Sequence, residues 1–263
     1  MSDEARLEAV PAADSPGRRR RRRRRVTILV IVLVVLAALC VAAELVARHV
    51  AEAEAEKQID SSLPAGTTGT VGVKIHGFSV ILQALSGHLD DVSLASHDLV
   101  VQKIPLTFDA TVTDVPLKQG GTTGPIDATV VIDQKALNDS KLLQNASGNI
   151  ALGSGTFSYD SSINILGLQL QYKLTAKPSV TSNGKSVVLT PTNAAISSSN
   201  SSIDVSSLLQ YLKTQPPTIC VASSLPTSAT LTGIGVTPGV ATFHLHSTGL
   251  PLDSAALSEK GTC

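Results

Sequence analysis

The feature that most constrains this chain lies near its N-terminus. An unbroken run of eight arginines, residues 18–25, is followed at once by 18 uncharged residues, 26–43, and the next charge is Glu44. At ~1.5 Å per residue, a helix of about 22 residues reaches roughly 33 Å, which is enough to cross a hydrocarbon layer of ~30 Å. The sequence therefore predicts a membrane-spanning helix over residues 26–47.

The arginine run also predicts the orientation of this helix, because positive charge concentrates on the cytoplasmic flank of a span. We expect a cytoplasmic basic tail over residues 1–25, a retained signal-anchor over 26–47 and an extracytoplasmic domain over 48–263, in a single-pass protein of the cell membrane. A cleaved signal peptide is the alternative, since Ala42-Ala43 or Ala51-Glu52-Ala53 supplies small residues for a cut. The apolar region of a signal peptide is usually ~7–15 residues long, which is shorter than the uncharged run 26–43 of this chain.

Net charge divides at the same place. The whole chain is neutral, but residues 1–25 hold nine arginines against four acids, which leaves +5 there and −5 on the remainder. After residue 25 the only arginine is Arg48. Such a domain is a poor match for a phosphate backbone, so we expect no nucleic-acid partner.

Periodicity after the span predicts the fold class. Residues 44–60 continue as a helix, and its packing face is expected to be Leu45, Val46, His49, Val50 and Ala53. From residue 70 apolar and polar residues alternate with period two, which is typical of half-buried strands. Strands are predicted near 71–75, 92–94, 104–112, 126–131, 150–159, 168–176, 185–196, 230–236 and 240–246, and helices at 78–85, 134–145 and 205–213. The pattern indicates one α+β domain with a mainly antiparallel sheet and a few helices.

Two finer features accompany this pattern. Asn183-Gly184 predicts a tight hairpin turn. In the helix expected at 78–85, four apolar side chains share one face: Phe78, Ile81, Leu82 and Leu85.

Cysteine placement predicts one disulfide. Cys40 lies within the apolar run and is expected to be a buried apolar side chain, which leaves Cys220 and Cys263 in the exported part. An even number of cysteines in an oxidising compartment favours a disulfide between them. Two free thiols are the alternative.

A search for catalytic and metal-binding patterns favours neither kind of site. The chain has no G-x-S-x-G, H-E-x-x-H, C-x-x-C, P-loop or G-x-G-x-x-G sequence. His244 and His246 share one face of a strand but lack a third ligand in the neighbouring sequence. We therefore expect no metal and no cofactor. An enzyme would gain support if His88, Asp91 and His97 converged in one cleft.

Residues 76–94, H-G-F-S-V-I-L-Q-A-L-S-G-H-L-D-D-V-S-L, carry a more specific signal. They resemble the actinobacterial LmeA-type phospholipid-binding family, in which a strand ends in glycine and is followed by a short Leu-Gln helix, a glycine and a D-x-V strand start. The matching positions are Gly77, Phe78, Leu82, Gln83, Gly87, Asp91, Val92 and Leu94. Residues 104–117 and the late cysteine pair also fit, so the likeness extends over residues 45–263. Ser79 departs from the family's commoner proline.

The resemblance implies an elongated, curved sheet wrapped on a helix around an apolar tunnel, similar to tubular lipid-binding domains. It implies a non-catalytic protein that binds phospholipid, such as phosphatidylinositol, at the cell membrane. It also implies a role in envelope glycolipid maturation of the lipomannan type. No protein partner can be named from it. The inward-facing residues expected to line the tunnel and bind lipid are Val71, Val73, Ile75, Phe78, Leu82, Leu85, Val92, Leu94, Ile104, Leu106, Phe108, Leu168, Leu170 and Tyr172.

A different function class fits the same composition. The apolar strand faces can instead pack into a solid core, and the chain is then a non-catalytic β-rich scaffold that docks another envelope protein. The two hypotheses predict different interiors: the scaffold has a filled core, and the lipid-binding protein has an open cavity.

Overall fold

The computed structural model describes residues 16–63, 66–101, 103–118, 120–139, 148–165, 168–198, 201–253 and 259–263. The chain divides into two compact units, Met1–Val46 and Ala47–Cys263. Helix α1 (Pro16–Ser62) begins in the first unit and ends in the second. Of the predicted cytoplasmic tail, residues 1–15 lie outside the described residues.

Helix α1 agrees with the predicted span in length and composition. Its 39-residue stretch Arg23–Ser61 contains a segment long and apolar enough to cross a membrane. The apolar side chains of this segment, such as Leu29 and Leu33, are exposed. An α-helix satisfies its own backbone hydrogen bonds, which is what a hydrocarbon layer requires.

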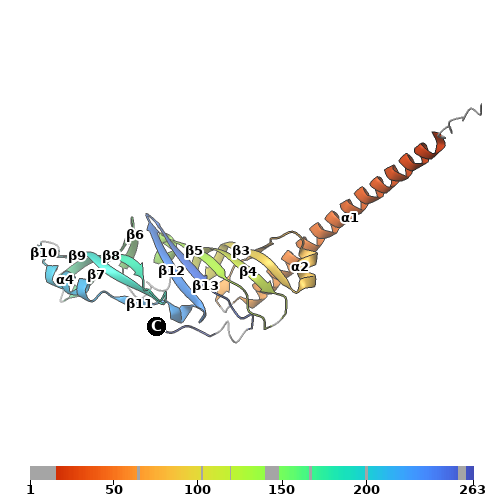
Figure 1. Cartoon of the computed structure of the whole chain (residues 1–263). Coiled ribbons are helices and arrows are strands. Elements are labelled where there is room, and N and C mark those ends of the chain that lie inside the picture. Colours follow the sequence, from red (N-terminus) through yellow and green to blue (C-terminus); the bar gives the residue numbers. More distant parts are fainter. Residues whose placement is uncertain are drawn as a thin grey trace, which may run out of the picture. The chain divides into compact units, whose positions relative to one another are not determined.

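The second unit contains a curled, half-barrel antiparallel sheet in the order β1-β3-β4-β5-β13-β12, with β2 also paired to β3 (Figure 1). Strands β3 and β4 are the longest pair, and β13 returns from the end of the chain to pair with β5. The strands are β1 (Thr67–Thr68), β2 (Gly72–Ile75), β3 (His88–Val101), β4 (Ile104–Pro116), β5 (Ile126–Asp133), β12 (Ala229–Thr237) and β13 (Val240–Ser247).

A second antiparallel sheet lies beside the first, in the order β10-β9-β8-β7-β6, with β11 paired to β9 (Figure 1). Its strands are β6 (Gly148–Leu152), β7 (Phe157–Ile165), β8 (Leu168–Val180), β9 (Ser186–Ser198), β10 (Ser201–Ile203) and β11 (Thr218–Cys220). Helix α3 (Gln134–Asp139) precedes this sheet, and helix α4 (Ser206–Thr214) and the short 3-10 helix η1 (Ala222–Ser224) follow its long strands. The single sheet expected from the sequence is therefore two. The predicted helix 134–145 matches α3 in its first part, and residues 140–145 lie outside the described residues.

The two sheets share one core. Leu152 of β6 packs with Val236 of β12 and Ala241 of β13, all three buried. Backbone hydrogen bonds also join the sheets, from Leu231 N–H to Gly184 O (2.9 Å), from Gly155 N–H to Val236 O (2.9 Å) and from Gly239 N–H to Leu152 O (3.2 Å). Ala47–Cys263 is consequently one compact unit although it contains two sheets.

The end of α1 lies along the free edge of β2 and contributes three carboxylates to it. The backbone N–H groups of Val71, Val73 and Ile75 donate to Asp60 Oδ1, Glu56 Oε1 and Glu52 Oε1 at 3.2, 3.0 and 3.0 Å. These N–H groups point away from β3 and otherwise form an open strand edge, which proteins usually cover. The four-residue spacing of the acids places them on one helix face, matched to alternate residues of a strand.

This contact corrects the packing face predicted for α1. The buried side of the helix carries Ala51, Ala55 and Ile59, which pack against the core around Val73 and Val92. The predicted face is exposed at Leu45, Val46, His49 and Val50. Helical spacing predicted that one face of α1 packs against the domain. Which face packs depends on the edge of β2, because its N–H groups bind the carboxylates of Glu52, Glu56 and Asp60.

We expect Glu52→Ala to reduce the free energy of unfolding by about 2 kcal/mol, because a buried, charge-assisted hydrogen bond to Ile75 N–H is lost. Lys74 Nζ, 3.3 Å from Glu52 Oε2, also loses its partner. Urea unfolding of the full chain in mild detergent measures the change. Glu54→Ala removes an exposed acid two residues away and should alter stability by less than about 0.5 kcal/mol. Equal effects of the two substitutions would contradict the strand-capping role.

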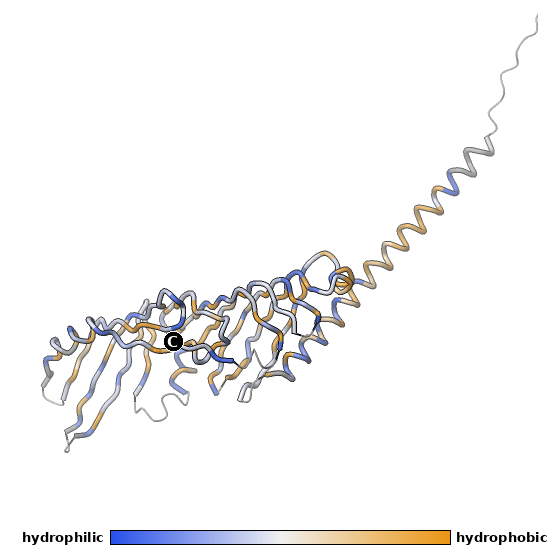
Figure 2. Tube along the Cα trace, turned by 60° about the horizontal axis from the view of Figure 1, so that its bottom comes forward, coloured by the Kyte–Doolittle hydropathy of each residue, from blue (hydrophilic) through white to orange (hydrophobic). Residues whose placement is uncertain are grey.

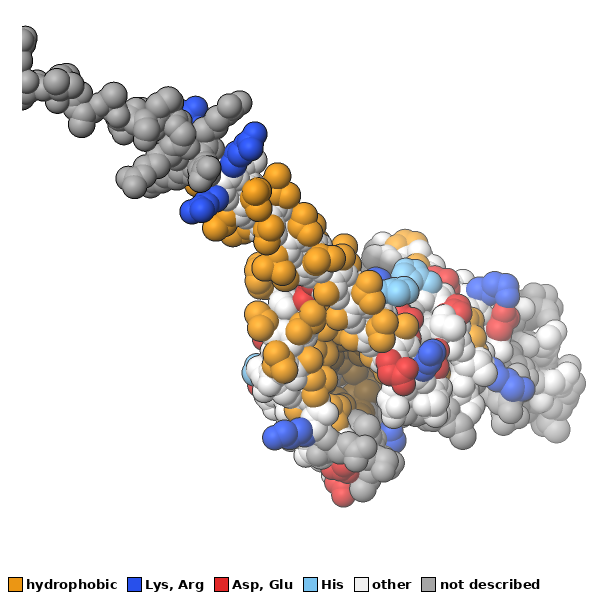
Figure 3. All heavy atoms as spheres, turned by 90° about the vertical axis from the view of Figure 1, so that its right-hand side faces the viewer, with side chains coloured by type: hydrophobic (Ala, Val, Ile, Leu, Met, Phe, Trp, Pro, Cys, Tyr) orange, Lys and Arg blue, Asp and Glu red, His pale blue; other side chains and the backbone are white. Residues whose placement is uncertain are grey.

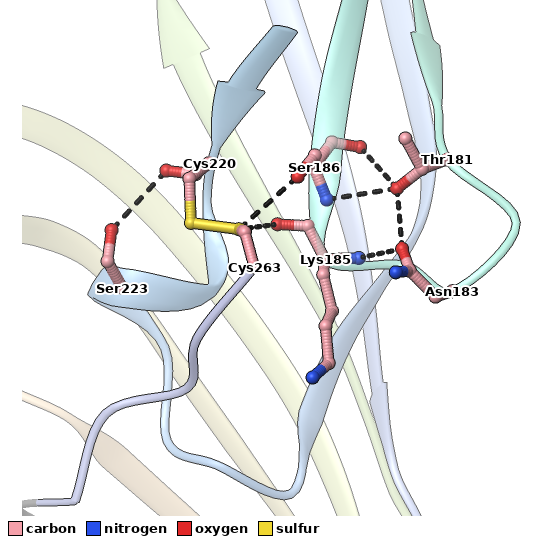
Figure 4. Close-up of a disulfide and its surroundings, with 7 residues drawn as sticks. All are labelled: Thr181, Asn183, Lys185, Ser186, Cys220, Ser223 and Cys263. Atoms are coloured by element: carbon pink, nitrogen blue, oxygen red, sulfur yellow. Dashed lines mark hydrogen bonds between the residues drawn. A yellow bond between two sulfur atoms is a disulfide. The ribbon is translucent and has the colours of Figure 1, made fainter.

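The predicted disulfide between Cys220 and Cys263 is confirmed (Figure 4). It ties the C-terminal residue to β11, and Ser186 Oγ donates to Cys263 Sγ at 3.2 Å. The predicted turn at Asn183-Gly184 lies nearby, between β8 and β9. There Asn183 Oδ1 accepts from Lys185 N–H (3.1 Å), and Gly184 has φ +68°. The disulfide therefore fastens the chain end to the same corner that the hairpin forms.

Candidate functional site

A cavity of about 800 Å³ opens on the concave side of the half-barrel sheet. Its wall is formed by alternate residues of the strands, because side chains of a strand point to opposite faces in turn. On β5, Ile126, Ala128 and Val130 face the cavity, while Asp127 and Thr129 line a smaller pocket that also includes Asp109 and Thr111 of β4. Figure 2 shows this alternation as orange and blue segments along the strands.

Hydrophobic side chains make up almost all of the cavity wall. They come from β2, β3, β4, β5 and β13, from the end of α1, and from the segments around residues 225 and 250. Figure 3 shows hydrophobic side chains gathered around a recess at one end of this unit. A volume of this size falls within the ~300–1,000 Å³ typical of small-molecule sites.

The buried polar groups of the wall are occupied by the protein itself. Thr123 Oγ1 donates to Gly124 O (2.9 Å) and accepts from Leu250 N–H (3.0 Å). Ser247 Oγ donates to Gly249 O at 3.1 Å. These hydroxyl groups hold loops in place, so the cavity offers its occupant mainly apolar contact.

The structure brings together part of the predicted lining. Val73, Ile75, Val92, Leu94 and Phe108 all line the cavity. Their part in lipid binding stays a prediction.

Other predicted residues lie elsewhere. Val71 is buried against the α1 edge, and Ile104 and Leu106 are outside the cavity wall. Leu168, Leu170 and Tyr172 belong to β8 of the second sheet, where Tyr172 stacks at a tilt on Tyr159 with ring centroids 6.0 Å apart. Leu82 and Leu85 belong to α2 (Val80–Ser86), Phe78 lies just before this helix, and all three have exposed side chains. A period-two pattern predicts which side chains of a strand share a face, but it does not tell which of two sheets the strand joins.

Sequence reasoning missed several wall residues. Ala55 and Ile59, four residues apart on α1, face the cavity, as do Leu245 of β13 and Leu250 and Leu252 beyond it. The helical spacing of Ala55 and Ile59 was a usable signal. The contribution of residues 245–252 depends on β13 pairing with β5, and local sequence does not encode that pairing.

The structure around α2 explains why the motif at residues 76–94 contains a buried glutamine between two glycines. The inner face of the helix is Val80 and Gln83, both buried, so the predicted apolar face is in fact the outer one. Gln83 Nε2 donates to His76 O (2.9 Å) and Gln83 Oε1 accepts from Asp90 N–H (2.9 Å). The side chain thereby joins the end of β2 to the start of β3.

The two glycines that flank α2 both have positive φ, but they differ in the space available for a side chain. Gly77 has φ +103°, and a Cβ there would collide with Gln83 Nε2. Gly87, the C-cap of α2, has φ +87° and open space around it. Both positions favour glycine, but only Gly77 also leaves room for the glutamine.

We therefore expect Gly77→Ala to destabilise the domain by about 3 kcal/mol, since it combines backbone strain with displacement of Gln83. Gly87→Ala incurs the strain alone and should cost about 1 kcal/mol. Thermal unfolding of both variants, followed by circular dichroism, measures the difference. A Gly87→Ala cost as large as that of Gly77→Ala would refute the steric role of Gly77.

The titratable clusters form no common cleft in the described part of the chain. His88 and His97 lie on β3, nine positions apart, which separates them by about 30 Å along an extended strand. Asp98 accepts from Thr70 N–H (3.1 Å), and this bond lowers the pKa of the Asp98 carboxyl. His244 and His246 pair with Thr129 and Asp127 across β13 and β5. Among the described residues, no three His, Cys, Asp or Glu side chains are placed to hold a metal ion.

With this geometry in place, comparison with protein families identifies the class. Residues 42–245 match the LmeA-like phospholipid-binding family. Because the match covers most of the chain, the protein belongs to this family. Comparison with curated proteins and with solved structures finds no match.

Proposed function

We propose that this protein is a membrane-anchored, extracytoplasmic phospholipid-binding protein that takes acyl chains into the cavity of its half-barrel sheet. The observation that carries the proposal is the open, almost wholly apolar cavity of about 800 Å³ in a chain of the LmeA-like phospholipid-binding family. A scaffold with a filled core has no such space.

The anchor and the compartment rest on separate observations. The segment within Arg23–Ser61 is apolar and long enough to span, and the arginine run favours a cytoplasmic N-terminus. The disulfide between Cys220 and Cys263 supports an oxidising, extracytoplasmic location for the domain. The tether keeps the cavity near a bilayer, and therefore near its ligand.

The energetics suit pick-up and release rather than permanent storage. Each methylene removed from water contributes ~0.8 kcal/mol. Bilayer tails are as apolar as the leucines of the wall, so exchange of a chain between bilayer and cavity is nearly balanced. The wall hydroxyls are already bonded to backbone, so the phospholipid headgroup lies outside the cavity. We extend the proposal to a role in envelope lipid or glycolipid biogenesis, without catalysis, with phosphatidylinositol-type lipids among the candidate ligands.

Photo-crosslinking tests lipid binding directly. The full chain is reconstituted into vesicles that contain a trace of phospholipid with a photoreactive group near the end of one acyl chain, and crosslinked peptides are mapped by mass spectrometry. We expect crosslinks in β3, β4 and β5 at residues such as Val92, Ala110 and Ala128, in addition to those within residues 26–47. Crosslinks restricted to residues 26–47 would show that the cavity takes no lipid. Competition by unlabelled phosphatidylinositol against other phospholipids then tests headgroup preference.

A further inference from the structure

Helix α2, Phe78 just before it and Leu117 just after β4 expose an unusual amount of hydrophobic side chain. Phe78 is 93% exposed, Leu85 81%, Leu82 60% and Leu117 50%. We call these four residues the α2 patch. Large apolar side chains grouped on a surface mark an interaction site rather than a core.

Hydrogen bonds hold the patch in a fixed position, although its side chains are exposed to solvent. Ser79 caps the helix by accepting from Leu82 N–H (3.2 Å), and Gln83 fixes the inner face to β2 and β3. Leu117 N–H donates to Gly87 O (3.0 Å), which attaches the last member of the patch to the end of the helix. The exposed face is therefore a fixed feature of the fold.

Chain connectivity places the patch close to the membrane. Arg48 is the first residue after the proposed anchor, 26–47. Its guanidinium donates to Ile75 O (3.1 Å) and Gly77 O (3.0 Å), immediately before Phe78. The segment that leads into α2 is thus bonded to the first residue outside the span, whatever the orientation of the domain.

The patch is also continuous with the cavity. Leu117 belongs to both, since it lines the cavity and is half exposed beside α2. Leu117 therefore lies where the exposed patch meets the apolar cavity wall.

We propose that the α2 patch inserts into the surface of the bilayer that holds the anchor and so seats the mouth of the cavity on the membrane. The occupant is the phospholipid surface rather than a protein, because Arg48 confines the patch to the immediate neighbourhood of the span. A small apolar patch binds a membrane weakly by itself, but a tether raises its effective concentration at the surface. The inference rests on the proposed anchor and lipid-binding function.

The absence of tryptophan from the chain makes the test direct. Phe78→Trp puts a single fluorophore in the patch, and Tyr211→Trp puts one on α4, at the other end of the domain, where Tyr211 is exposed as well (Figure 1). Each full-length variant is reconstituted into vesicles of phosphatidylcholine and phosphatidylglycerol, with or without bromine on the acyl chains. Bromine quenches only tryptophan that enters the bilayer.

We expect bromolipid to remove most of the Phe78→Trp fluorescence and to leave that of Tyr211→Trp unchanged, while aqueous iodide quenches only Tyr211→Trp. Equal accessibility of both tryptophans to iodide, without bromine quenching, would overturn the proposal. Protection of Phe78→Trp from both quenchers would also overturn it, because a second copy of the chain or another protein would then cover the patch.

A second pair of measurements separates this inference from the proposed function. If bromolipid quenches Phe78→Trp but no acyl chain crosslinks to the cavity, the patch docks and lipid binding fails. If the cavity crosslinks but Phe78→Trp stays exposed, lipid binding holds and docking fails.

Leu82→Glu combined with Leu85→Glu should slow cavity crosslinking several-fold while leaving thermal stability unchanged, because both side chains are exposed. Unchanged crosslinking rates would count against docking.

Discussion

Ala128→Trp is expected to abolish crosslinking of acyl chains to the cavity while leaving the domain folded. Ala128 lies in the middle of β5 with its side chain on the cavity wall. An indole there occupies space that the proposed ligand needs. In a close-packed core the same substitution costs ~1–3 kcal/mol by overpacking, whereas an open cavity of about 800 Å³ accommodates it. Crosslinking yield and thermal unfolding, measured on the same preparation, report the two effects.

Thr129→Trp is the matched control, because it carries the same side chain on the same strand but toward the opposite face. It should retain cavity crosslinking. Strong destabilisation by Ala128→Trp would instead indicate a filled core and favour the scaffold hypothesis. Leu106, which the sequence placed in the lining, is outside the cavity wall and is not suited to this test.

Removal of the disulfide by Cys220→Ser with Cys263→Ser should lower the free energy of unfolding by about 4 kcal/mol. The bond closes a loop of 43 residues, and a cross-link of that length removes about this much loop entropy from the unfolded chain. For a domain of this size the melting temperature should fall by about 10 °C. Thermal unfolding monitored by the β-sheet circular dichroism signal measures it.

The third cysteine provides the control. Cys40 is a free thiol on α1, so Cys40→Ser should leave the melting temperature of the domain unchanged. A reducing agent should reproduce the loss in the parent chain and have no further effect on the double variant. A double variant within about 1 kcal/mol of the parent would mean that β11 and the C-terminal residue are held by packing alone.

Much of the fold follows from local pattern. Alternation along 104–112 predicted β4, Asn183-Gly184 predicted the β8–β9 hairpin, and the helices at α2 and α4 were located to within about two residues. The paired cysteines predicted the disulfide. Each of these depends on a period or a spacing that neighbouring residues carry by themselves.

The candidate site was only partly predictable. Val73, Val92 and Phe108 lie in the cavity wall, because strand alternation fixes which side chains of a strand share a face. Phe78, Leu82 and Leu85 are exposed instead, because helical spacing identifies an apolar face without showing whether anything covers it. The inner face of α2 is instead the one that carries the polar residue Gln83, because its side chain is buried and hydrogen-bonded to the backbone of His76 and Asp90.

The sequence by itself determined the apolar segment long enough to span a membrane, most of the strand positions, the Asn183-Gly184 turn, the cysteine pair and the likeness to a phospholipid-binding family, although the strand predicted at 150–159 is in fact the two strands β6 and β7. These features are set by length, period and residue type along the chain. Only the tertiary structure decided that the strands form two sheets, that β13 pairs with β5, and that a cavity remains between β2–β5 and α1. Those outcomes depend on contacts between residues far apart in sequence, where burial and hydrogen-bond satisfaction select among faces that local periodicity leaves equivalent.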